Sequence, residues 1–475
     1  MISRKGLADA VGELRAAFPA DRLVEDGERL AEYGKDESDL GVFPPGAVVK
    51  VESAEEVRAV FAIASRHRAP VVPIAARSGK SGGSLSIHGG IGVSMERMNR
   101  ILEIRPADLT ARVEPGVITG VFQAEVEKHG LFYPPDPNSL DLCTIGGNVA
   151  ENAGGPRALR YGVTREYVLG LEVVIPTGEI LRVGRQTIKG VAGYDLTALF
   201  VGSEGTLGIV TEVTLKLLPR PRHVATALVC FPDVATAAQA VSRVLAAGVI
   251  PRCLELIDDV SVQAIAKGSP FQLPPGAGAA LLFETDGNDQ EQVFAEMARV
   301  AEMVQGSASG EVIVAQNEAQ RRDIWETRKY LSVALKTLAG SKLSEDIAVP
   351  RSRIPEMVAR SREIGKAHGL LVATYGHAGD GNLHCNVLFE GEGRRAAAEG
   401  AVADILRAAV DMGGTITGEH GVGLAKRDFL EYEQGAELVA LQRRLKALFD
   451  PLGLLNPGKI FPGAGAGPAP AGNGS

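Results

Sequence analysis

The apolar positions in the first part of the chain predict helices that alternate with strands. Residues 6–18 carry apolar side chains at helical spacing, which predicts an amphipathic helix. A strand, a second helix and another strand are then expected at residues 47–51, 54–67 and 71–75. Ser53 precedes the second helix as an N-cap, and Glu56 follows three residues later, which is the pattern of a capping box.

Beyond residue 75 the pattern changes twice. Short β-branched runs between glycine-rich loops predict strands at residues 90–94, 110–113, 169–175 and 209–217. From residue 222 to about 460, Ala-rich helices such as 234–247 and 354–368 alternate with strands. We therefore expect an α+β chain. Its parts are a helical N-terminal segment, two α+β domains and a disordered Gly/Ala/Pro tail, with limits at 1–35, 36–220, 221–462 and 463–475.

Composition and charge narrow the class of protein. The 475 residues are 45% hydrophobic and 23% charged, as in an ordinary globular protein. Lys and Arg number 50 against 58 Asp and Glu, so no basic excess favours nucleic-acid binding. The four cysteines stand far apart, which argues against a disulfide framework, a zinc ribbon and an iron–sulfur cluster. Without a recognisable signal peptide or membrane segment, we expect a cytoplasmic protein that could reach a membrane only through a partner.

Ten of the 57 glycines lie in three loops of the first half, at residues 73–83, 135–155 and 201–208. Successive glycine-rich turns can aim backbone N–H groups inward and form anion-binding nests. Each loop alone is more typical of a tight turn, but three in one domain favour a large phosphate-bearing cofactor. No dinucleotide fingerprint is present, and Ile460 replaces the hydroxyl residue that a nucleotide P-loop at 453–459 would need.

Histidines mark a second candidate site. Residues 370–375 and 383–388 read as the strands of a hairpin with its turn at Asp380-Gly381. His377 and His384 are then expected opposite each other, with Asn386 on the face of His384. Two converging imidazoles can chelate a divalent metal, although two surface histidines are an equal alternative.

Several of these segments together resemble a known flavoprotein superfamily, that of vanillyl-alcohol oxidase and p-cresol methylhydroxylase. Within it, the chain is most similar to the FAD-linked D-2-hydroxy-acid dehydrogenases, which include the glycolate oxidase catalytic subunit, D-lactate dehydrogenase (cytochrome type) and D-2-hydroxyglutarate dehydrogenase. The resemblance covers residues 25–462 and rests on segments 143–155, 191–197 and 200–209. It implies a two-part FAD-binding PCMH-type domain, followed by an α+β FAD-linked oxidase C-terminal (cap) domain.

The resemblance also implies which residues contact FAD. They are Ala76, Arg77, Ser78, Gly79, Lys80, Asn138, Thr144, Gly147, Asn152, Gly154, Gly202, Glu204, Gly205 and Gly208. The first loop departs from the family pattern, since Ala75 and Arg77 replace two glycines. Arg77 is a candidate for a phosphate contact, and a differently placed loop is the alternative. The nearest histidine is His88, several residues downstream, so we expect FAD to be bound non-covalently.

By the same resemblance, the second half carries the chemistry. His377, His384 and Glu419 would bind zinc or a similar divalent metal, and His420 would be the catalytic base. Arg328 would bind the substrate carboxylate, and Lys342 and Asn386 would be further substrate-binding residues. A guanidinium fork suits a carboxylate.

The expected activity is that of an FAD-dependent dehydrogenase. It would oxidise a small D-2-hydroxy acid, D-lactate or glycolate, to the 2-oxo acid. The hydride would pass to flavin and the electrons to a separate acceptor: an iron–sulfur subunit, a cytochrome or electron-transfer flavoprotein. The alternatives are a D-2-hydroxyglutarate dehydrogenase, a flavin oxidase that uses oxygen, and a non-catalytic flavin-binding subunit of a larger complex. Relatives of the glycolate and lactate type carry segments similar to residues 345–351, so the resemblance favours a short substrate.

Overall fold

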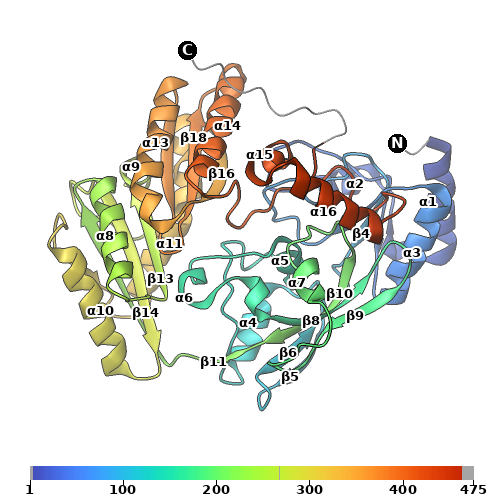
Figure 1. Ribbon diagram of the computed structural model, residues 1–475, viewed down its shortest axis with the longest axis horizontal. Coiled ribbons are helices and arrows are strands. Elements are labelled where there is room, and N and C mark those ends of the chain that lie inside the picture. Colours follow the sequence, from blue (N-terminus) through green and yellow to red (C-terminus); the bar gives the residue numbers. More distant parts are fainter. Residues whose placement is uncertain (1–3, 267, 463–475) are drawn as a thin grey trace. The chain divides into compact units, whose positions relative to one another are not determined.

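The computed structural model describes residues 4–266 and 268–462, and the tail predicted at 463–475 lies outside them (Figure 1). The chain forms two compact units, which are described separately. Unit 1 comprises Met1–Ala153, Val163–Arg220 and Glu419–Ser475, and only its described residues are discussed below. Unit 2 comprises Gly154–Gly162 and Pro221–Gly418.

Unit 1 begins with a four-stranded sheet in the order β1-β2-β4-β3, in which β2, β4 and β3 are parallel. Its strands are β1 (Leu23–Val24), β2 (Ala47–Lys50), β3 (Val71–Ile74) and β4 (Ile91–Ser94), and its helices are α1 (Arg4–Ala17), α2 (Gly27–Tyr33) and α3 (Ala54–His67). The amide of Glu56 donates to Oγ of Ser53 at 3.3 Å, so the predicted N-cap is confirmed. Apolar side chains of α1 and α3 form one core with this sheet.

A second, antiparallel sheet of unit 1 follows the order β5-β6-β10-β8-β9. Its strands are β5 (Ile101–Arg105), β6 (Thr110–Val113), β8 (Val168–Val174), β9 (Ile180–Gly184) and β10 (Ile209–Lys216). Short helices and a two-stranded ribbon complete this part: α4 (Thr119–Glu127), α5 (Ile145–Glu151), α7 (Leu196–Phe200), β7 (Leu131–Phe132) and β11 (Leu218–Pro219). The glycine-rich loops connect these elements.

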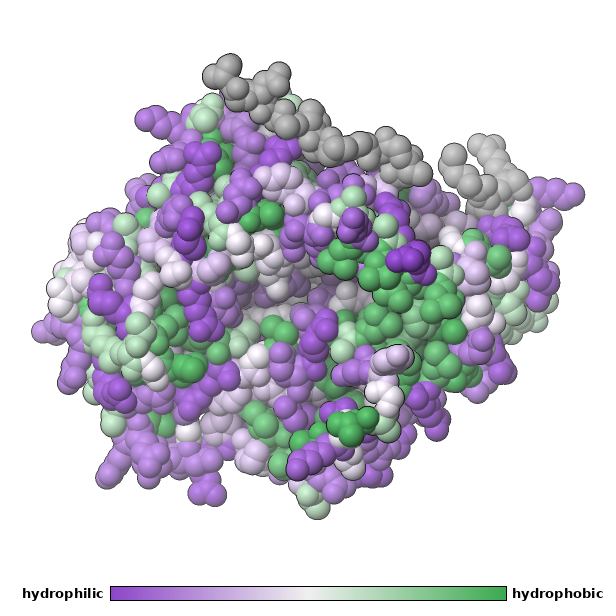
Figure 2. Space-filling view, viewed as in Figure 1, coloured by the Kyte–Doolittle hydropathy of each residue, from purple (hydrophilic) through white to green (hydrophobic). Residues whose placement is uncertain are grey.

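The C-terminal helices α15 (Leu430–Gln434) and α16 (Ala436–Phe449) belong to unit 1. The ring of Phe449 meets that of Phe200 edge-on, 5.5 Å between centroids, and Nζ of Lys446 donates to the carbonyl of Thr206 at 2.6 Å. The units separate between Arg220 and Pro221, at the expected limit of the first domain. They differ from the expected limits elsewhere, because Gly154–Gly162 belong to unit 2 and the described residues from Glu419 onward belong to unit 1. Figure 2 shows an apolar area in the region of α16, and this helix exposes Leu438, Leu441 and Leu448.

Unit 2 is built on a seven-stranded antiparallel sheet in the order β15-β12-β14-β13-β17-β18-β16 (Figure 1). Its strands are β12 (His223–Phe231), β13 (Cys253–Asp258), β14 (Ala279–Gly287), β15 (Ile313–Val314), β16 (Ser341–Ala348), β17 (Leu371–His377) and β18 (Asn382–Phe389). Its helices are α6 (Ala158–Tyr161), α8 (Val234–Ala246), α9 (Asp259–Ile265), α10 (Gln290–Gln305), α11 (Glu318–Ala334), α12 (Lys336–Ala339), α13 (Ile354–Ala367) and α14 (Arg395–Asp411). The predicted helices at 234–247 and 354–368 are α8 and α13.

The α+β fold with two main parts is thus confirmed, and both faces of the unit 2 sheet are covered. Side chains of α9 and α11 pack on one face with Leu228, Ile257 and Leu282. Helices α8, α10, α13 and α14 contact the same strands, whose alternate side chains, such as Val229 and Leu281, are also buried. Among the described helices, none combines the length and the apolar character needed to span a membrane.

Candidate active site

One face of the unit 2 sheet carries four of the seven metal-binding, substrate-binding and catalytic residues predicted from the sequence. Glu255 lies two residues before Ile257, whose side chain packs in the apolar cluster with α11, so strand alternation directs both toward that helix. The polar or aromatic side chains on the same face of the neighbouring strands are Tyr375, His377, His384, Asn386, Lys342 and Asp346. The pleat of four adjacent strands therefore gathers groups that are far apart in the sequence.

The carboxylate of Glu255 on β13 is shared by two partners. Its Oε1 atom lies 2.6 Å from Nδ1 of His377, which is paired with Glu255 in the β13–β17 register. Its Oε2 atom accepts from Nε of Arg328 at 2.8 Å, and Nη2 of the same guanidinium is also 2.8 Å away. Burial raises the pKa of the Glu255 carboxyl, but attraction to His377 and Arg328 outweighs this and lowers the pKa to about 2. Glu255 is therefore an ionised, fully buried carboxylate that is paired on both sides.

Arg328 is held from two directions. It lies on α11 with 8% of its surface exposed, and its guanidinium carbon is 4.7 Å from the centroid of the Tyr375 ring. Such stacking adds a cation–π attraction to the ion pair with Glu255. The predicted substrate arginine is thus a buried, oriented side chain, unlike a solvated arginine on a helix surface.

The two histidines lie on one face of the hairpin, but they are not directly opposite each other. The register pairs His384 with Tyr375, and His377 is two residues further along β17. The predicted cross-strand pairing is therefore wrong, because β18 already begins at Asn382, two residues before His384. The histidines are diagonal neighbours, with ring centroids 5.3 Å apart and the rings almost perpendicular, at 86°.

The other two predicted substrate residues contact each other. Nζ of Lys342, on β16, donates to Oδ1 of Asn386 on β18 at 3.0 Å and to Oγ of Ser332 on α11 at 2.9 Å. Asn386 is fully buried, and its amide nitrogen donates to the carbonyl of His384 at 3.0 Å. Lys342 and Asn386 therefore share the sheet face of His384.

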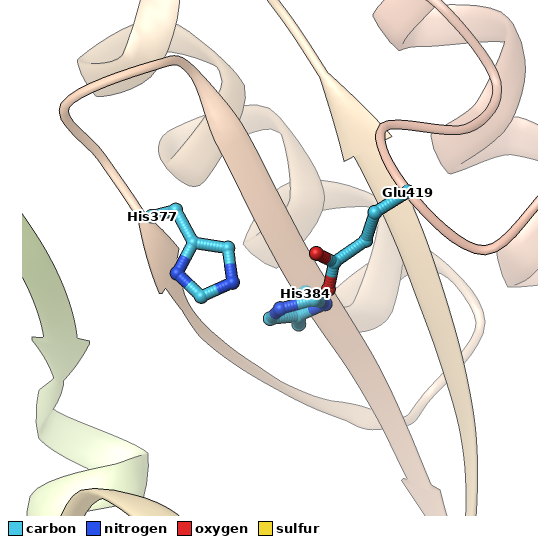
Figure 3. A group of neighbouring side chains, drawn as sticks. All are labelled: His377, His384 and Glu419. Atoms are coloured by element: carbon cyan, nitrogen blue, oxygen red, sulfur yellow. The ribbon is translucent and has the colours of Figure 1, made fainter. Parts of the chain in front are cut away.

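Glu419 completes a three-residue group with the histidines. It follows Gly418, the last residue of unit 2, and Gly418 is fixed to this unit by its amide, which donates to Oδ2 of Asp346 at 2.9 Å. One ligand atom from each of His377, His384 and Glu419 can be chosen so that all lie within 4.8 Å of one another. Figure 3 shows the three side chains directed toward a common point.

The chemistry of this group fits a divalent cation. Because an ionised carboxylate only accepts hydrogen bonds, Nδ1 of His377 carries a proton toward Glu255, so in the neutral imidazole Nε2 is the nitrogen with the lone pair. This is the arrangement in which histidine ligands are usually oriented by a carboxylate. Two imidazole nitrogens and one carboxylate are the donor set of many zinc sites that keep an open position.

His420, the predicted base, stands next to the group without belonging to it. Its Nε2 atom is 3.8 Å from Oε1 of Glu419, and both side chains are largely buried. Glu419 and His420 are neighbouring residues of one loop, so their side chains can face the same small region.

The predicted cofactor residues lie mostly in unit 1, where a cavity of about 910 Å³ opens. Ala76, Arg77 and Thr144 line it, together with Gly116 and apolar side chains. Thr144 caps α5, since its Oγ1 atom accepts from the amide of Gly147 at 3.4 Å. A cavity of this size suits a large cofactor.

The altered first loop has a structural explanation. Arg77 has φ = 60°, a left-handed conformation that glycine adopts without strain and other residues rarely adopt. Its guanidinium donates to the carbonyl of Glu32 at 2.6 Å and lies 4.8 Å from the centroid of the Tyr33 ring. These contacts stabilise an arginine where the family pattern has glycine, and they occupy the group considered for a phosphate contact.

The remaining predicted cofactor residues fall into three groups. Ser78 and Gly79 are partly exposed in the loop after β3, whereas Lys80 and Asn138 are exposed. Close packing within unit 1 accounts for other positions: a Cβ on Gly205 or Gly208 would lie 2.5 Å from Pro73 or 2.4 Å from Val173. Gly202 packs against Asn152, whose Oδ1 atom accepts from the amide of Arg165, and Gly154 belongs to unit 2.

Glu204 faces the C-terminal loop of unit 1. Its carboxylate accepts from the amides of Val422 and Gly423 at 2.8 and 2.6 Å, just beyond His420. Burial raises the pKa of Glu204, and the two amides partly oppose this. The structure gives this residue a role in holding the loop of His420, in addition to the cofactor contact predicted for it.

Sequence reasoning missed Glu255 and Asp346. Both are fully buried acids that orient predicted site residues. A signal was present for Glu255, because a charged residue inside the apolar run 253–257 has to be paired. Asp346 gave no comparable signal, since its partners come from a loop about 70 residues later.

Two family models match the chain. The model "FAD binding domain" matches residues 45–184, and "FAD linked oxidases, C-terminal domain" matches residues 220–460. Together they cover most of the chain, in the order expected for a flavin domain followed by its cap domain.

Curated relatives and solved structures agree with these matches. The chain is 44% identical to glycolate oxidase subunit GlcD of Bacillus subtilis (strain 168), over 88% of this chain and 89% of that protein. It is 36% identical to D-lactate dehydrogenase of Anaerostipes hadrus, over 93% of each. Its fold is similar to that of p-cresol methylhydroxylase, with a TM-score of 0.81 and 17% identity over 97% of this chain and 98% of the other. The chain therefore belongs to the FAD-linked oxidases and is an FAD-binding oxidoreductase with a PCMH-type fold.

Proposed function

We propose that this flavoprotein oxidises a small D-2-hydroxy acid, D-lactate or glycolate, to the 2-oxo acid and passes the electrons to a separate acceptor protein. The observation that carries the proposal is the shared sheet face on which His377 and His384 lie beside Arg328 and Lys342. A 2-hydroxy acid has a hydroxyl and a carboxylate on neighbouring carbons. The histidines would hold a metal for the hydroxyl, and the cations Arg328 and Lys342 would bind the carboxylate. The names of two relatives, a glycolate oxidase subunit and a D-lactate dehydrogenase, support the same substrate class.

In this proposal His377, His384 and Glu419 hold a divalent metal, for which zinc fits the donors. A bound metal lowers the pKa of a hydroxyl that it coordinates. His420 takes the hydroxyl proton, and bound FAD would supply the acceptor for the hydride on C2. The substrate loses one proton and one hydride, which leaves the 2-oxo acid. His420 is the base because it is adjacent to the metal group yet outside it.

The role of Arg328 and Lys342 is to fix the carboxylate. Nε and Nη2 of Arg328 bind Glu255, which leaves the Nη1 group for the substrate. Lys342 is oriented by Asn386 and Ser332 and supplies a second positive charge. Two fixed cations would hold the carboxylate in one orientation, which would favour one enantiomer of the substrate.

A substrate screen tests the proposal. The FAD-loaded protein is assayed by dye reduction with glycolate, both enantiomers of lactate, and D-2-hydroxyglutarate. We expect the highest kcat/KM with D-lactate or glycolate, and little turnover of L-lactate. Equal rates with D- and L-lactate, or no turnover of any 2-hydroxy acid, would contradict the proposal. Steady hydrogen peroxide formation without a dye would identify an oxidase that needs no acceptor protein.

A pair of arginine variants tests the carboxylate clamp. Arg328→Lys keeps the charge but loses the fork, so we expect a higher KM and a lower kcat. Arg321→Lys is the matched control, since Arg321 lies on the same helix and also pairs with a glutamate, Glu284, outside the site. Equal kinetic effects of both variants would contradict a specific role of Arg328.

A further inference from the structure

Glu255 is a buried residue of the site that the proposed function uses neither as a metal ligand, nor as the base, nor as a substrate-binding residue. Its carboxylate contacts two residues to which the proposed function gives different roles, with Oε1 on His377 and Oε2 on Arg328.

We propose that Glu255 is a positioning residue that orients the metal ligand His377 and the substrate anchor Arg328 together. Metal binding and carboxylate binding are coupled through its two oxygen atoms. This inference rests on the proposed function for the roles of His377 and Arg328, while the contacts themselves belong to the structure.

The geometry leaves Glu255 little freedom. Its strand is paired on both sides, with β14 and β17, and its side chain is fully buried. The contact with His377 selects the imidazole tautomer in which Nε2 is the metal-binding atom. The contact with Arg328 occupies one edge of the guanidinium and turns the other away from the carboxylate. A movement of either partner therefore displaces the carboxylate that the other partner needs.

A substitution that keeps the shape of the Glu255 side chain distinguishes its orienting role toward His377 and Arg328 from its contribution to packing. In Glu255→Gln the side chain keeps its shape but has one acceptor oxygen and one NH₂ group, so it cannot accept from both partners. We expect zinc affinity to fall about 10- to 100-fold, the usual cost of losing an outer-shell partner of a metal ligand. We also expect KM for the hydroxy acid to rise, since Arg328 loses its fixed orientation.

The control is Glu284→Gln. Glu284 is also buried, lies on the adjacent strand β14, and pairs with Arg252 while accepting from Nε1 of Trp325 at 2.6 Å. Like Glu255, it is a buried carboxylate paired with an arginine, but it does not contact the metal group. Its substitution therefore measures the loss of stability that follows from removing any buried carboxylate. We expect its effect on stability to be similar and its zinc affinity to remain that of the wild type.

Glu255→Asp covers the case in which the glutamine variant fails to fold. Aspartate keeps the charge that Arg328 needs but is one methylene shorter, so it cannot reach both partners. We expect this variant to fold and to lose zinc affinity, to raise KM, or both. Retention of wild-type values for both quantities would overturn the inference.

The decisive measurement is zinc affinity of the FAD-loaded proteins, determined by competition with a chelator and elemental analysis, and independent of turnover. Weaker zinc binding in Glu255→Gln than in Glu284→Gln supports the inference. If the wild type binds zinc and Glu255→Gln binds it equally well, Glu255 does not position the ligand, while the proposed function stands. If the wild type binds no zinc, the metal part of the proposed function and this inference both fail.

Discussion

The backbone amide of Gly418, the residue before Glu419, donates a 2.9 Å hydrogen bond to the carboxylate of Asp346. The same carboxylate accepts from Oγ1 of Thr417 at 3.0 Å and from the side-chain amide of Asn382. A Cβ atom at position 418 would lie 2.2 Å from Nδ2 of Asn382. The polar groups that fix this loop therefore occupy the space that any other residue would need.

Gly418→Ala tests whether this contact places Glu419. The added methyl group has to displace Asn382 or the loop, so we expect about 1–3 kcal/mol lower stability, as in other overpacked sites. We also expect the zinc content of the FAD-loaded protein to fall. Gly393→Ala is the control, because a Cβ at that position meets no atom within 4 Å. Thermal unfolding and elemental analysis measure the two effects, and normal zinc content in Gly418→Ala would show that the loop tolerates the shift.

The ligand and base roles can be separated by two histidine variants. His384→Ala removes a metal-binding atom and should reduce both metal content and activity. His420→Ala should keep the metal and lower kcat about 10²–10⁴-fold, the usual range for general acid–base catalysis. Neither variant should release FAD. Elemental analysis distinguishes them, and loss of metal from His420→Ala would place this residue among the ligands.

FAD is expected to be bound tightly but non-covalently. His88, the histidine that follows the altered first loop, does not line the unit 1 cavity. His129 does line it, but this residue lies outside the three glycine-rich loops. Acid precipitation should leave all of the yellow colour in the supernatant. A coloured, flavin-containing pellet would demonstrate a covalent bond.

A buried acid in unit 1 gives a pH-dependent prediction. Oε2 of Glu151 is buried without a hydrogen-bond partner among the described residues, and burial together with the charges of Glu204 and Asp36 raises the pKa of Glu151. A group with a raised folded-state pKa binds more protons in the folded state. Its contribution to stability is therefore complete below about pH 4.3, the unfolded value, and is lost as the pH rises through the folded pKa.

The glutamine in Glu151→Gln cannot ionise, whereas the wild type loses stability as Glu151 ionises. The stability of the variant relative to the wild type should therefore increase from pH 5 to pH 8. Each unit of pKa shift corresponds to about 1.4 kcal/mol. Midpoints of thermal unfolding at the two pH values measure the difference. The exposed residue Glu179 provides the control variant Glu179→Gln. A relative stability that is the same at both pH values would show that Glu151 ionises normally.

Local sequence patterns were sufficient for much of the fold. The second predicted helix, at 54–67, has the limits of α3, and its cap at Ser53 is present because both depend on neighbouring residues only. The hairpin with its turn at Asp380-Gly381 is also present. Its register was wrong by two residues, since strand ends depend on pairing with β13 and β16, which the local pattern does not contain.

The site was predictable as a set of residues but not as a geometry. The motifs singled out His377, His384 and Glu419, and these three form one group in the structure. The partners that orient them, Glu255 and Asp346, come from other strands and become visible only once the sheet order is known. Arg77 illustrates the opposite case, because its left-handed backbone is tolerated through Tyr33 and Glu32, about 45 residues earlier.

We expect this FAD-linked oxidoreductase to need a metal at His377, His384 and Glu419 to oxidise a short 2-hydroxy acid. The most direct measurement is turnover of the best substrate by the FAD-loaded protein before chelation, after removal of the metal, and after return of zinc. The account predicts that activity falls with zinc content and recovers when zinc is returned, while the flavin spectrum stays near normal. Full activity of the metal-free, FAD-loaded protein would contradict it.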